Sequence, residues 1–181
     1  MARQFIFLFG PRACGKSTKA RVLGGLLPGW AVVDIDYEFR LEYEPRIAKD
    51  PSLAGADFYY RGCRELLLAT IGREARAIVA LNGGCLCSKQ ASEVAVMNVR
   101  DCRENGRLVL LLPTPFDFLN RRILFKREQA RGYYILREHT FASYNRKINL
   151  WRQAADLVAY GSNPERVARR IVAKTMGGGK F

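Results

Sequence analysis

The hydrophobic residues of this chain gather in five short runs, separated by longer segments of mixed apolar and polar residues. Each run is continuously apolar rather than alternating, which is typical of strands buried on both faces of a parallel sheet. We therefore expect strands at residues 4–9, 30–33, 77–81, 108–112 and 156–160.

The segments between these runs predict helices, because their apolar residues recur every three or four positions, as Leu67 and Ile71 do. A proline inside a helical pattern ends or kinks the helix, so we expect a break at Pro45. The basic and aromatic segment 127–137 has no clear assignment from its pattern. The expected helices are 16–27, 37–49, 57–72, 88–103, 116–126, 138–154 and 165–175.

Alternation of strands and helices predicts an α/β fold with three layers, in which helices cover both faces of a parallel sheet. We find no repeat and no second domain, so we expect one domain over residues 1–176, followed by a flexible, glycine-rich tail at 177–181. Ligands of such folds bind at the carboxyl ends of the strands. Polar or glycine-rich stretches follow three of the expected strands, at 10–18, 34–36 and 82–84.

The charge of the chain favours an anionic partner. Its formal net charge is +13, with 30 Lys and Arg residues against 17 Asp and Glu residues. Phosphorylated or carboxylated metabolites suit this charge, and nucleic acid is less favoured because the chain has no recognised nucleic-acid motif. We expect a monomer.

No apolar run approaches the roughly 20 residues of a membrane span. The sequence enters a strand almost at once, which leaves no room for a signal peptide, so we expect a cytoplasmic location. The five cysteines match no zinc-binding spacing and are expected to be reduced.

The stretch from Gly10 to Thr18 reads G-x-x-x-x-G-K-S-T, which is the phosphate-binding P-loop, between an apolar run and an expected helix. Its glycines allow the backbone to approach a phosphate chain, and its N–H groups form an anion nest at the helix N-terminus. Lys16 brings a positive charge to the β- and γ-phosphates, and the Ser17 hydroxyl can bind Mg²⁺. The motif predicts binding of ATP and Mg²⁺, with nucleotide contacts from Gly10, Arg12, Ala13, Cys14, Gly15, Lys16, Ser17 and Thr18.

Two carboxylates, Asp34 and Asp36, follow the second strand. Paired carboxylates at this edge are costly unless a positive group meets them, and a P-loop with Mg²⁺ would supply one. Asp34 could hold the metal through water, and Asp36 could accept a proton from an acceptor hydroxyl or orient that hydroxyl. The alternative is that one aspartate caps the next helix while the other is solvated.

With these motifs, the chain resembles shikimate kinase nearly from end to end. The opening strand and P-loop, the D-x-D of Asp34 and Asp36, and the glycine turn at 82–84 look like those of this family. The resemblance implies a P-loop kinase fold with a five-stranded parallel sheet in the order 2-3-1-4-5 and a mobile lid at about residues 126–138. It implies transfer of a phosphoryl group from ATP to shikimate, which gives shikimate 3-phosphate in aromatic amino-acid biosynthesis.

The resemblance also implies roles for individual residues. Tyr60-Arg61 looks like the family's Phe-Arg pair, whose arginine grips the shikimate carboxylate, and Arg146 or Lys147 stands near a second such arginine. Asp34 then serves magnesium and Asp36 is the base, while Lys16 and a lid arginine, Arg127 or Arg131, act on the transferred group. The remaining contacts implied are Asn82, Gly83 and Gly84 for shikimate, and Ser162, Asn163 and Pro164 for adenine.

Several positions depart from the family pattern. Asn82 replaces the first of three glycines and is expected to bring a side chain into the acceptor site. The glutamate expected after the Phe-Arg pair is missing, and a register that starts at Phe58 would put Tyr59 in the arginine's place. A kinase for another small hydroxylated acid, a nucleotide or polynucleotide kinase, and a non-catalytic ATP-binding regulator therefore remain as alternatives.

Overall fold

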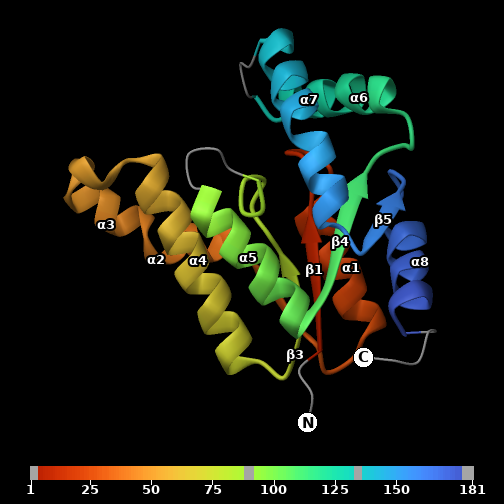
Figure 1. The fold of residues 1–181 in the computed structure, drawn as a ribbon, viewed down its shortest axis with the longest axis horizontal. Coiled ribbons are helices and arrows are strands. Elements are labelled where there is room, and N and C mark those ends of the chain that lie inside the picture. Colours follow the sequence, from red (N-terminus) through yellow and green to blue (C-terminus); the bar gives the residue numbers. More distant parts are fainter. Residues whose placement is uncertain (1–3, 88–91, 133–135, 177–181) are drawn as a thin grey trace.

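The computed structural model of this protein describes residues 4–87, 92–132 and 136–176. The strands of these residues form one sheet in the order β2-β3-β1-β4-β5, and every neighbouring pair is parallel (Figure 1). The expected fold class and strand order are therefore confirmed. The strands are β1 (Gln4–Phe9), β2 (Ala31–Asp34), β3 (Arg76–Ala80), β4 (Gly106–Leu112) and β5 (Leu157–Tyr160).

The helices lie where the apolar spacing predicted them, with shifts at their ends. The expected break near Pro45 divides the segment into α2 and α3 and places this proline in the first turn of α3. Three expected segments lie wholly or partly outside the described residues: the start of the helix at 88–103, residues 133–135 of the lid, and the tail at 177–181. The helices are α1 (Lys16–Leu26), α2 (Ile35–Glu42), α3 (Glu44–Lys49), η1 (Pro51–Leu53), α4 (Ala56–Arg73), α5 (Ser92–Asn105), α6 (Asp117–Gln129), α7 (Arg137–Ala154) and α8 (Pro164–Met176).

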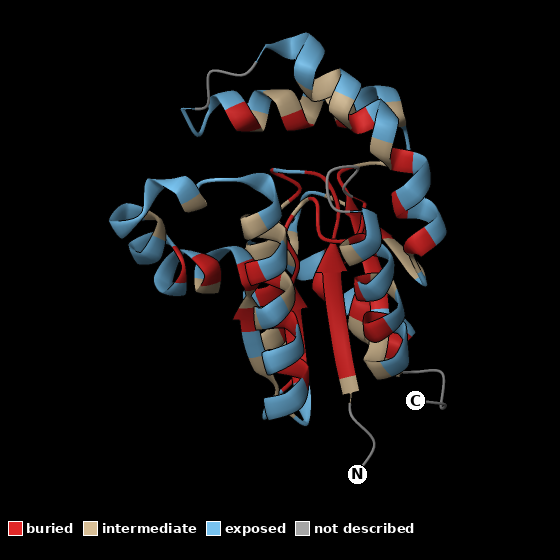
Figure 2. Cartoon of the chain, turned by 60° about the vertical axis from the view of Figure 1, so that its left-hand side comes forward, coloured by how far each residue is buried: buried red, intermediate tan, exposed pale blue. Residues whose placement is uncertain are grey.

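The sheet lies between two helical layers. Helices α1 and α8 pack against each other on one face, and α4 and α5 pack together on the other (Figure 1). The middle strand β1 is buried by both layers, so Phe5, Phe7 and Phe9 are among the largest fully buried side chains of the described residues (Figure 2). Burial on both faces explains why the strands read as continuous apolar runs.

Two helical arms extend beyond the carboxyl ends of the strands. One consists of α2 and α3, and the other of α6 and α7 (Figure 2). The second arm includes the segment expected to be a lid, and α6 continues three residues past its expected end at 126. None of the helices in the described parts of the chain is long and apolar enough to cross a membrane.

Candidate active site

The P-loop joins β1 to α1 and has the backbone that phosphate binding requires. Gly10, Ala13 and Gly15 have φ angles of 138°, 60° and 88°, in the region that favours glycine. A side chain at Gly10 would also lie 2.7 Å from the carbonyl oxygen of Leu111, so β4 leaves no space for one. The Lys16 ammonium donates to the carbonyls of Gly10 and Pro11, at 3.3 Å each, and therefore lies over the loop.

A cavity of about 1060 Å³ lies at this edge of the sheet, between the P-loop and both helical arms. Polar and charged side chains from separate elements meet in it, as expected from the strand ends. Of the residues predicted to bind nucleotide, metal or acceptor, those that line it are Arg12, Ala13, Gly15, Lys16, Ser17, Thr18, Asp34, Asp36, Gly83, Gly84, Arg131, Arg146 and Lys147. The other described residues that were predicted to bind nucleotide, metal or acceptor do not line the cavity. They are Gly10, Cys14, Arg61, Asn82, Arg127, Ser162, Asn163 and Pro164.

The two aspartates after β2 have different surroundings. Asp34 caps α2, because one of its oxygens, Oδ1, accepts hydrogen bonds from the backbone N–H groups of Asp36 and Tyr37. Asp36 lies in the first turn of α2 and accepts a hydrogen bond of 2.6 Å from the Tyr59 hydroxyl. The capping alternative is therefore correct for Asp34, and both carboxylates still line the cavity.

The two candidate lid arginines lie in different places. Arg131, just beyond α6, lines the cavity. Arg127 instead donates to the carbonyl oxygen of Ala13 at 3.3 Å and to the Ser162 hydroxyl at 2.9 Å. It thus joins α6 to the P-loop and to the turn before α8, which are the two segments predicted to contact the nucleotide.

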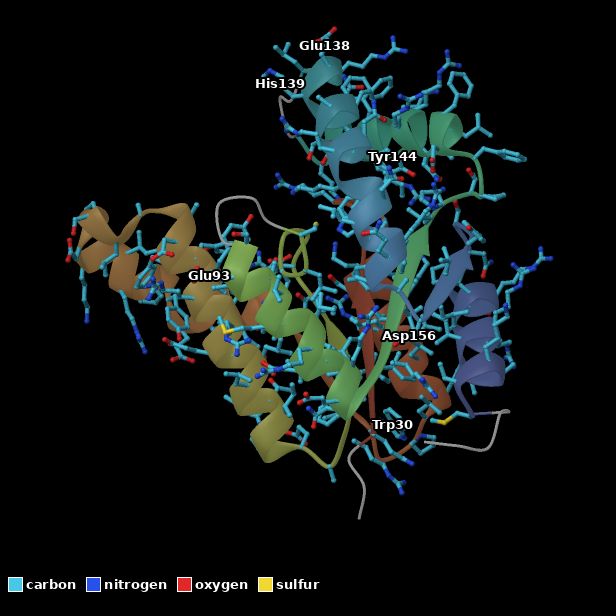
Figure 3. All side chains as sticks on the ribbon, viewed as in Figure 1. Trp30, Glu93, Glu138, His139, Tyr144 and Asp156 are labelled. Carbon is cyan, nitrogen blue, oxygen red and sulfur yellow. The ribbon has the colours of Figure 1, made fainter. Side chains whose placement is uncertain are left out.

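The arm that carries Arg131 is held together by hydrogen bonds. Tyr144 lies midway along α7, and Figure 3 shows it well below His139 and Glu138 at the outer end of that helix. Its hydroxyl donates to Asp117 at 2.7 Å and accepts from the Asn120 amide at 3.1 Å, both on α6. Because α6 and α7 are joined in this way, they form one connected structure on that side of the cavity.

Comparisons with known proteins show the family to which this chain belongs. The family model described as shikimate kinase matches residues 12–175. The chain belongs to the shikimate kinase family. Members of this family are ATP-dependent small-molecule kinases, and this chain is one of them. No curated protein matches the chain.

Solved structures of this family have the same fold. Shikimate kinase from Acinetobacter baumannii, in complex with shikimate, has a TM-score of 0.75 at 19% identity and covers 99% of this chain and 96% of its own. The enzyme from Aquifex aeolicus has a TM-score of 0.71 at 20% identity, with 96% of each chain covered. That from Bacteroides thetaiotaomicron has a TM-score of 0.73 at 16% identity and covers 94% and 96%.

The predicted carboxylate-binding Arg61 does not lie in the cavity. Its side chain is 71% exposed and pairs with Asp57, one helical turn earlier on α4, at 2.8 Å. Tyr59 and Tyr60 are the residues of this helix that line the cavity. Successive side chains of a helix point about 100° apart, so a shift of one or two residues turns a side chain away from its expected site.

Tyr59 contacts the Asp36 carboxylate from α4. Of the preferred pair Tyr60-Arg61, Tyr60 lines the cavity and Arg61 does not, while Tyr59, which the alternative register put in the place of the arginine, lines it too. Burial, followed by the negative charge of Asp36, raises the pKa of Tyr59 well above its ordinary range. Its phenol therefore keeps its proton and acts as a hydrogen-bond donor.

Asn82 is also oriented differently from the prediction, which placed its side chain in the acceptor site. It is only 2% exposed, and its Oδ1 accepts a hydrogen bond of 3.0 Å from the backbone N–H of Gly84. Gly83 and Gly84 therefore line the cavity, while the buried Asn82 side chain stabilises the turn through its hydrogen bond to Gly84. A side chain at Gly84 would lie 2.4 Å from the Tyr60 hydroxyl, which explains the glycine there.

Arg40 is a cavity residue that the sequence reasoning missed. It lies one turn after Asp36 on α2, and its guanidinium is 5.8 Å from the centre of the Tyr37 ring. The spacing from Asp36 to Arg40 could have identified it, because residues four apart share a helix face and Asp36 was already expected at the site. It adds a cation on the α2 side of the cavity, in addition to Arg146 and Lys147 on α7.

A second missed cation lies beneath the P-loop. Lys19 is only 3% exposed, and its ammonium donates to the carbonyl of Cys14 at 2.8 Å. Burial is the main cause that lowers its pKa, and the charges of Arg127 and Lys16 lower it further. By binding this carbonyl on the inner side, Lys19 helps to keep the N–H groups of the loop available to phosphate.

The donor set suits magnesium that arrives with a nucleotide. No group of three or more His, Cys, Asp or Glu side chains that could hold a metal alone exists among the residues described. The cavity instead offers the Ser17 hydroxyl and the Asp34 carboxylate, which are hard oxygen donors. Mg²⁺ prefers such a site, where few protein oxygens are completed by phosphates and water.

Proposed function

We propose that this protein transfers the γ-phosphoryl group of ATP to a hydroxyl of shikimate, with Mg²⁺ as cofactor. The observation that carries this proposal is that the P-loop, Asp36 and the Gly83-Gly84 turn line one cavity. The donor and acceptor groups are thus within a single site. Membership of the shikimate kinase family supports shikimate as the acceptor.

In the proposed reaction the P-loop N–H groups and Lys16 bind the β- and γ-phosphates of ATP. Ser17 and Asp34 would hold Mg²⁺, which supplies charge neutralisation at the phosphate oxygens when it is bound. The Arg131 guanidinium approaches the transferred group from the lid side. Positioning and charge stabilisation supply most of the rate in such transfers, so this arrangement of cations is the main catalytic device.

On the acceptor side, Asp36 accepts a hydrogen bond from the hydroxyl that attacks phosphorus and takes its proton as the new P–O bond forms. The acceptor lies beside Tyr60 and the Gly83-Gly84 turn, which line the cavity, with its carboxylate toward Arg146 and Lys147. A guanidinium or ammonium binds a carboxylate through charge-assisted hydrogen bonds. Arg127, Ser162, Asn163 and Pro164 border the adenine end of the nucleotide site.

The direct test is ADP release from ATP and Mg²⁺, measured with and without shikimate. We expect a rate that depends strongly on shikimate in the parent protein, and its loss in Lys16→Ala. Lys174→Ala is a matched control, because it removes an exposed lysine of α8 outside the cavity. A rate in the parent protein that shikimate does not raise above the background ATP hydrolysis would refute shikimate as the acceptor.

A second candidate function is phosphorylation of another small hydroxylated acid. It is favoured by one observation: Arg61, the residue predicted to bind the acceptor carboxylate, does not line the cavity, while Arg40 lines it on the α2 side. The acceptor would therefore meet a cation on its α2 side, where Arg40 lies, and not on the α4 side, where Arg61 was expected. The same ADP assay with a panel of small hydroxylated acids distinguishes the two candidates by their kcat/KM values.

A further inference from the structure

The hydroxyl of Tyr59 holds one oxygen of the Asp36 carboxylate. It donates a hydrogen bond of 2.6 Å to Oδ1 from α4 to the first turn of α2. Asp36 itself is exposed, so without this bond its carboxylate would be free to rotate between rotamers. The bond engages Oδ1 and leaves Oδ2 for a second donor.

The Tyr59 ring is fixed by its neighbours. Its plane packs edge-on against the ring of Phe39 with centroids 4.8 Å apart, and against Tyr60 with centroids 5.3 Å apart. Edge-to-face contacts of this kind are favourable and restrict a ring to one orientation. The phenol therefore has a fixed direction, which it imposes on the carboxylate.

A tyrosine at this position differs chemically from an arginine. It is neutral and donates a single hydrogen bond, so it orients the carboxylate without neutralising its charge. The phenol therefore engages Oδ1 alone, and Oδ2 can receive a hydroxyl from the cavity. A guanidinium would instead offer several donors and compete with the acceptor for both oxygens.

We propose that Tyr59, held by Phe39 and Tyr60, is a positioning residue for Asp36 and turns Oδ2 of the carboxylate toward the acceptor hydroxyl. This inference rests on the proposed function, in which Asp36 receives that hydroxyl. It assigns a role to a residue that has no expected contact with the nucleotide.

The test is Tyr59→Phe, which keeps the ring and removes only the hydroxyl. We expect kcat to fall roughly ten- to a hundredfold, the value of a hydrogen bond to a charged group, while the KM values for ATP and acceptor change less than about threefold. Tyr43→Phe is the matched control. It removes another phenol that donates to a carboxylate, that of Glu65, in the same aromatic cluster but outside the cavity.

The control separates positioning from stability. Both variants lose one phenol–carboxylate bond, so both are expected to lower the melting temperature, but only Tyr59→Phe is expected to lower kcat. Equal kcat values in Tyr59→Phe and Tyr43→Phe would overturn the proposal. So would a Tyr59→Phe variant whose KM rises while its kcat stays at the parent value.

A second measurement does not depend on the acceptor. In protein labelled with ¹³C at the aspartate carboxyl carbons, Asp36→Asn identifies the Asp36 resonance. Tyr59→Phe is expected to shift that resonance, and Tyr43→Phe is not. An unchanged Asp36 resonance in Tyr59→Phe would overturn the proposal whether or not shikimate is a substrate. Failure of the proposed function shows separately, as a parent protein without shikimate-dependent ADP release.

Discussion

The start of β4 offers a sharp test of the structure, because the same substitution should have opposite effects at two glycines. Gly106 pairs with Phe5 of β1, and a methyl group there would lie 2.2 Å from the Phe5 carbonyl oxygen and 2.7 Å from its carbon. These are backbone atoms in the middle of the sheet, so Gly106→Ala must displace a strand. Gly25 is exposed on α1, and a methyl group added there would meet no other atom within 4 Å.

The magnitude follows from these contacts. Overpacking costs about 1–3 kcal/mol, and a weakened β1–β4 hydrogen bond adds about 1 kcal/mol, so we expect Gly106→Ala to lower the free energy of unfolding by about 3 kcal/mol. In a domain of this size each kcal/mol corresponds to about 2–4 °C, which predicts a melting temperature about 6–12 °C lower. Gly25→Ala should raise the stability by about 0.5–1 kcal/mol, because glycine is a poor helix former.

Thermal unfolding followed by circular dichroism, together with urea unfolding, measures both variants against the parent. Below its transition, Gly106→Ala should retain the parent kcat, because residue 106 begins β4 and the cavity lies beyond the other ends of the strands. A melting temperature within about 2 °C of the parent for Gly106→Ala would refute this account of how β1 and β4 pair. A melting temperature for Gly25→Ala below that of the parent would show that a methyl group at this position is not accommodated, contrary to the open space around Gly25.

Three further predictions follow from the site and the core. Lys147→Ala should raise the acceptor KM about tenfold or more, the value of a lost charge-assisted hydrogen bond, and Arg61→Ala should leave it unchanged, as steady-state kinetics would show. Arg64→Ala should cost about 2–4 kcal/mol in urea unfolding, because it removes the 2.9 Å ion pair with the buried carboxylate of Asp101 and leaves that carboxylate with the longer contact from Arg100, at 3.5 Å. An Arg64→Ala variant as stable as the parent would contradict that pairing. Burial raises the pKa values of Cys63, Cys85, Cys87 and Cys102, so these thiols stay protonated in the folded protein while unfolded thiols ionise near pH 8.5. The contribution of these thiols to the free energy of unfolding should therefore be fully present below about pH 8 and decrease as the pH rises from there toward 12. Cys85→Ala should make this decrease smaller, as urea titrations at pH 7 and pH 10 would show.

The strands and the P-loop could be predicted because each depends on a local pattern. A run such as Phe5 to Phe9 has one stable environment, the inside of a two-sided sheet, and the glycines of the P-loop have φ angles that few other residues tolerate. Asp34 and Asp36 could be placed because carboxyl ends of parallel strands meet at one edge. The sheet order followed from the family resemblance and not from these patterns.

The acceptor side was harder to predict because it depends on the rotation of helices and turns. One residue along α4 turns a side chain by about 100°, so the choice between Tyr59 and Arg61 depended on the register of a short motif. For Asn82, sequence reasoning gave the position of the residue and not its direction, which is set by the N–H of Gly84. Arg127 was placed near the right segment, but its partners are 114 and 35 positions away in the chain.

The contact between α1 and α8 has a consequence for how the protein forms during synthesis. The helix that follows the P-loop packs against a helix more than a hundred residues later in the chain (Figure 1). Residues up to about 30 therefore leave the ribosome well before α8, and one face of α1 stays uncovered until residues 164–176 follow. At about 5–20 residues per second, that interval lasts roughly 7–30 seconds. During this time the apolar face of α1 is accessible to chaperones, and the P-loop helix lacks the contact with α8 that it has in the folded protein.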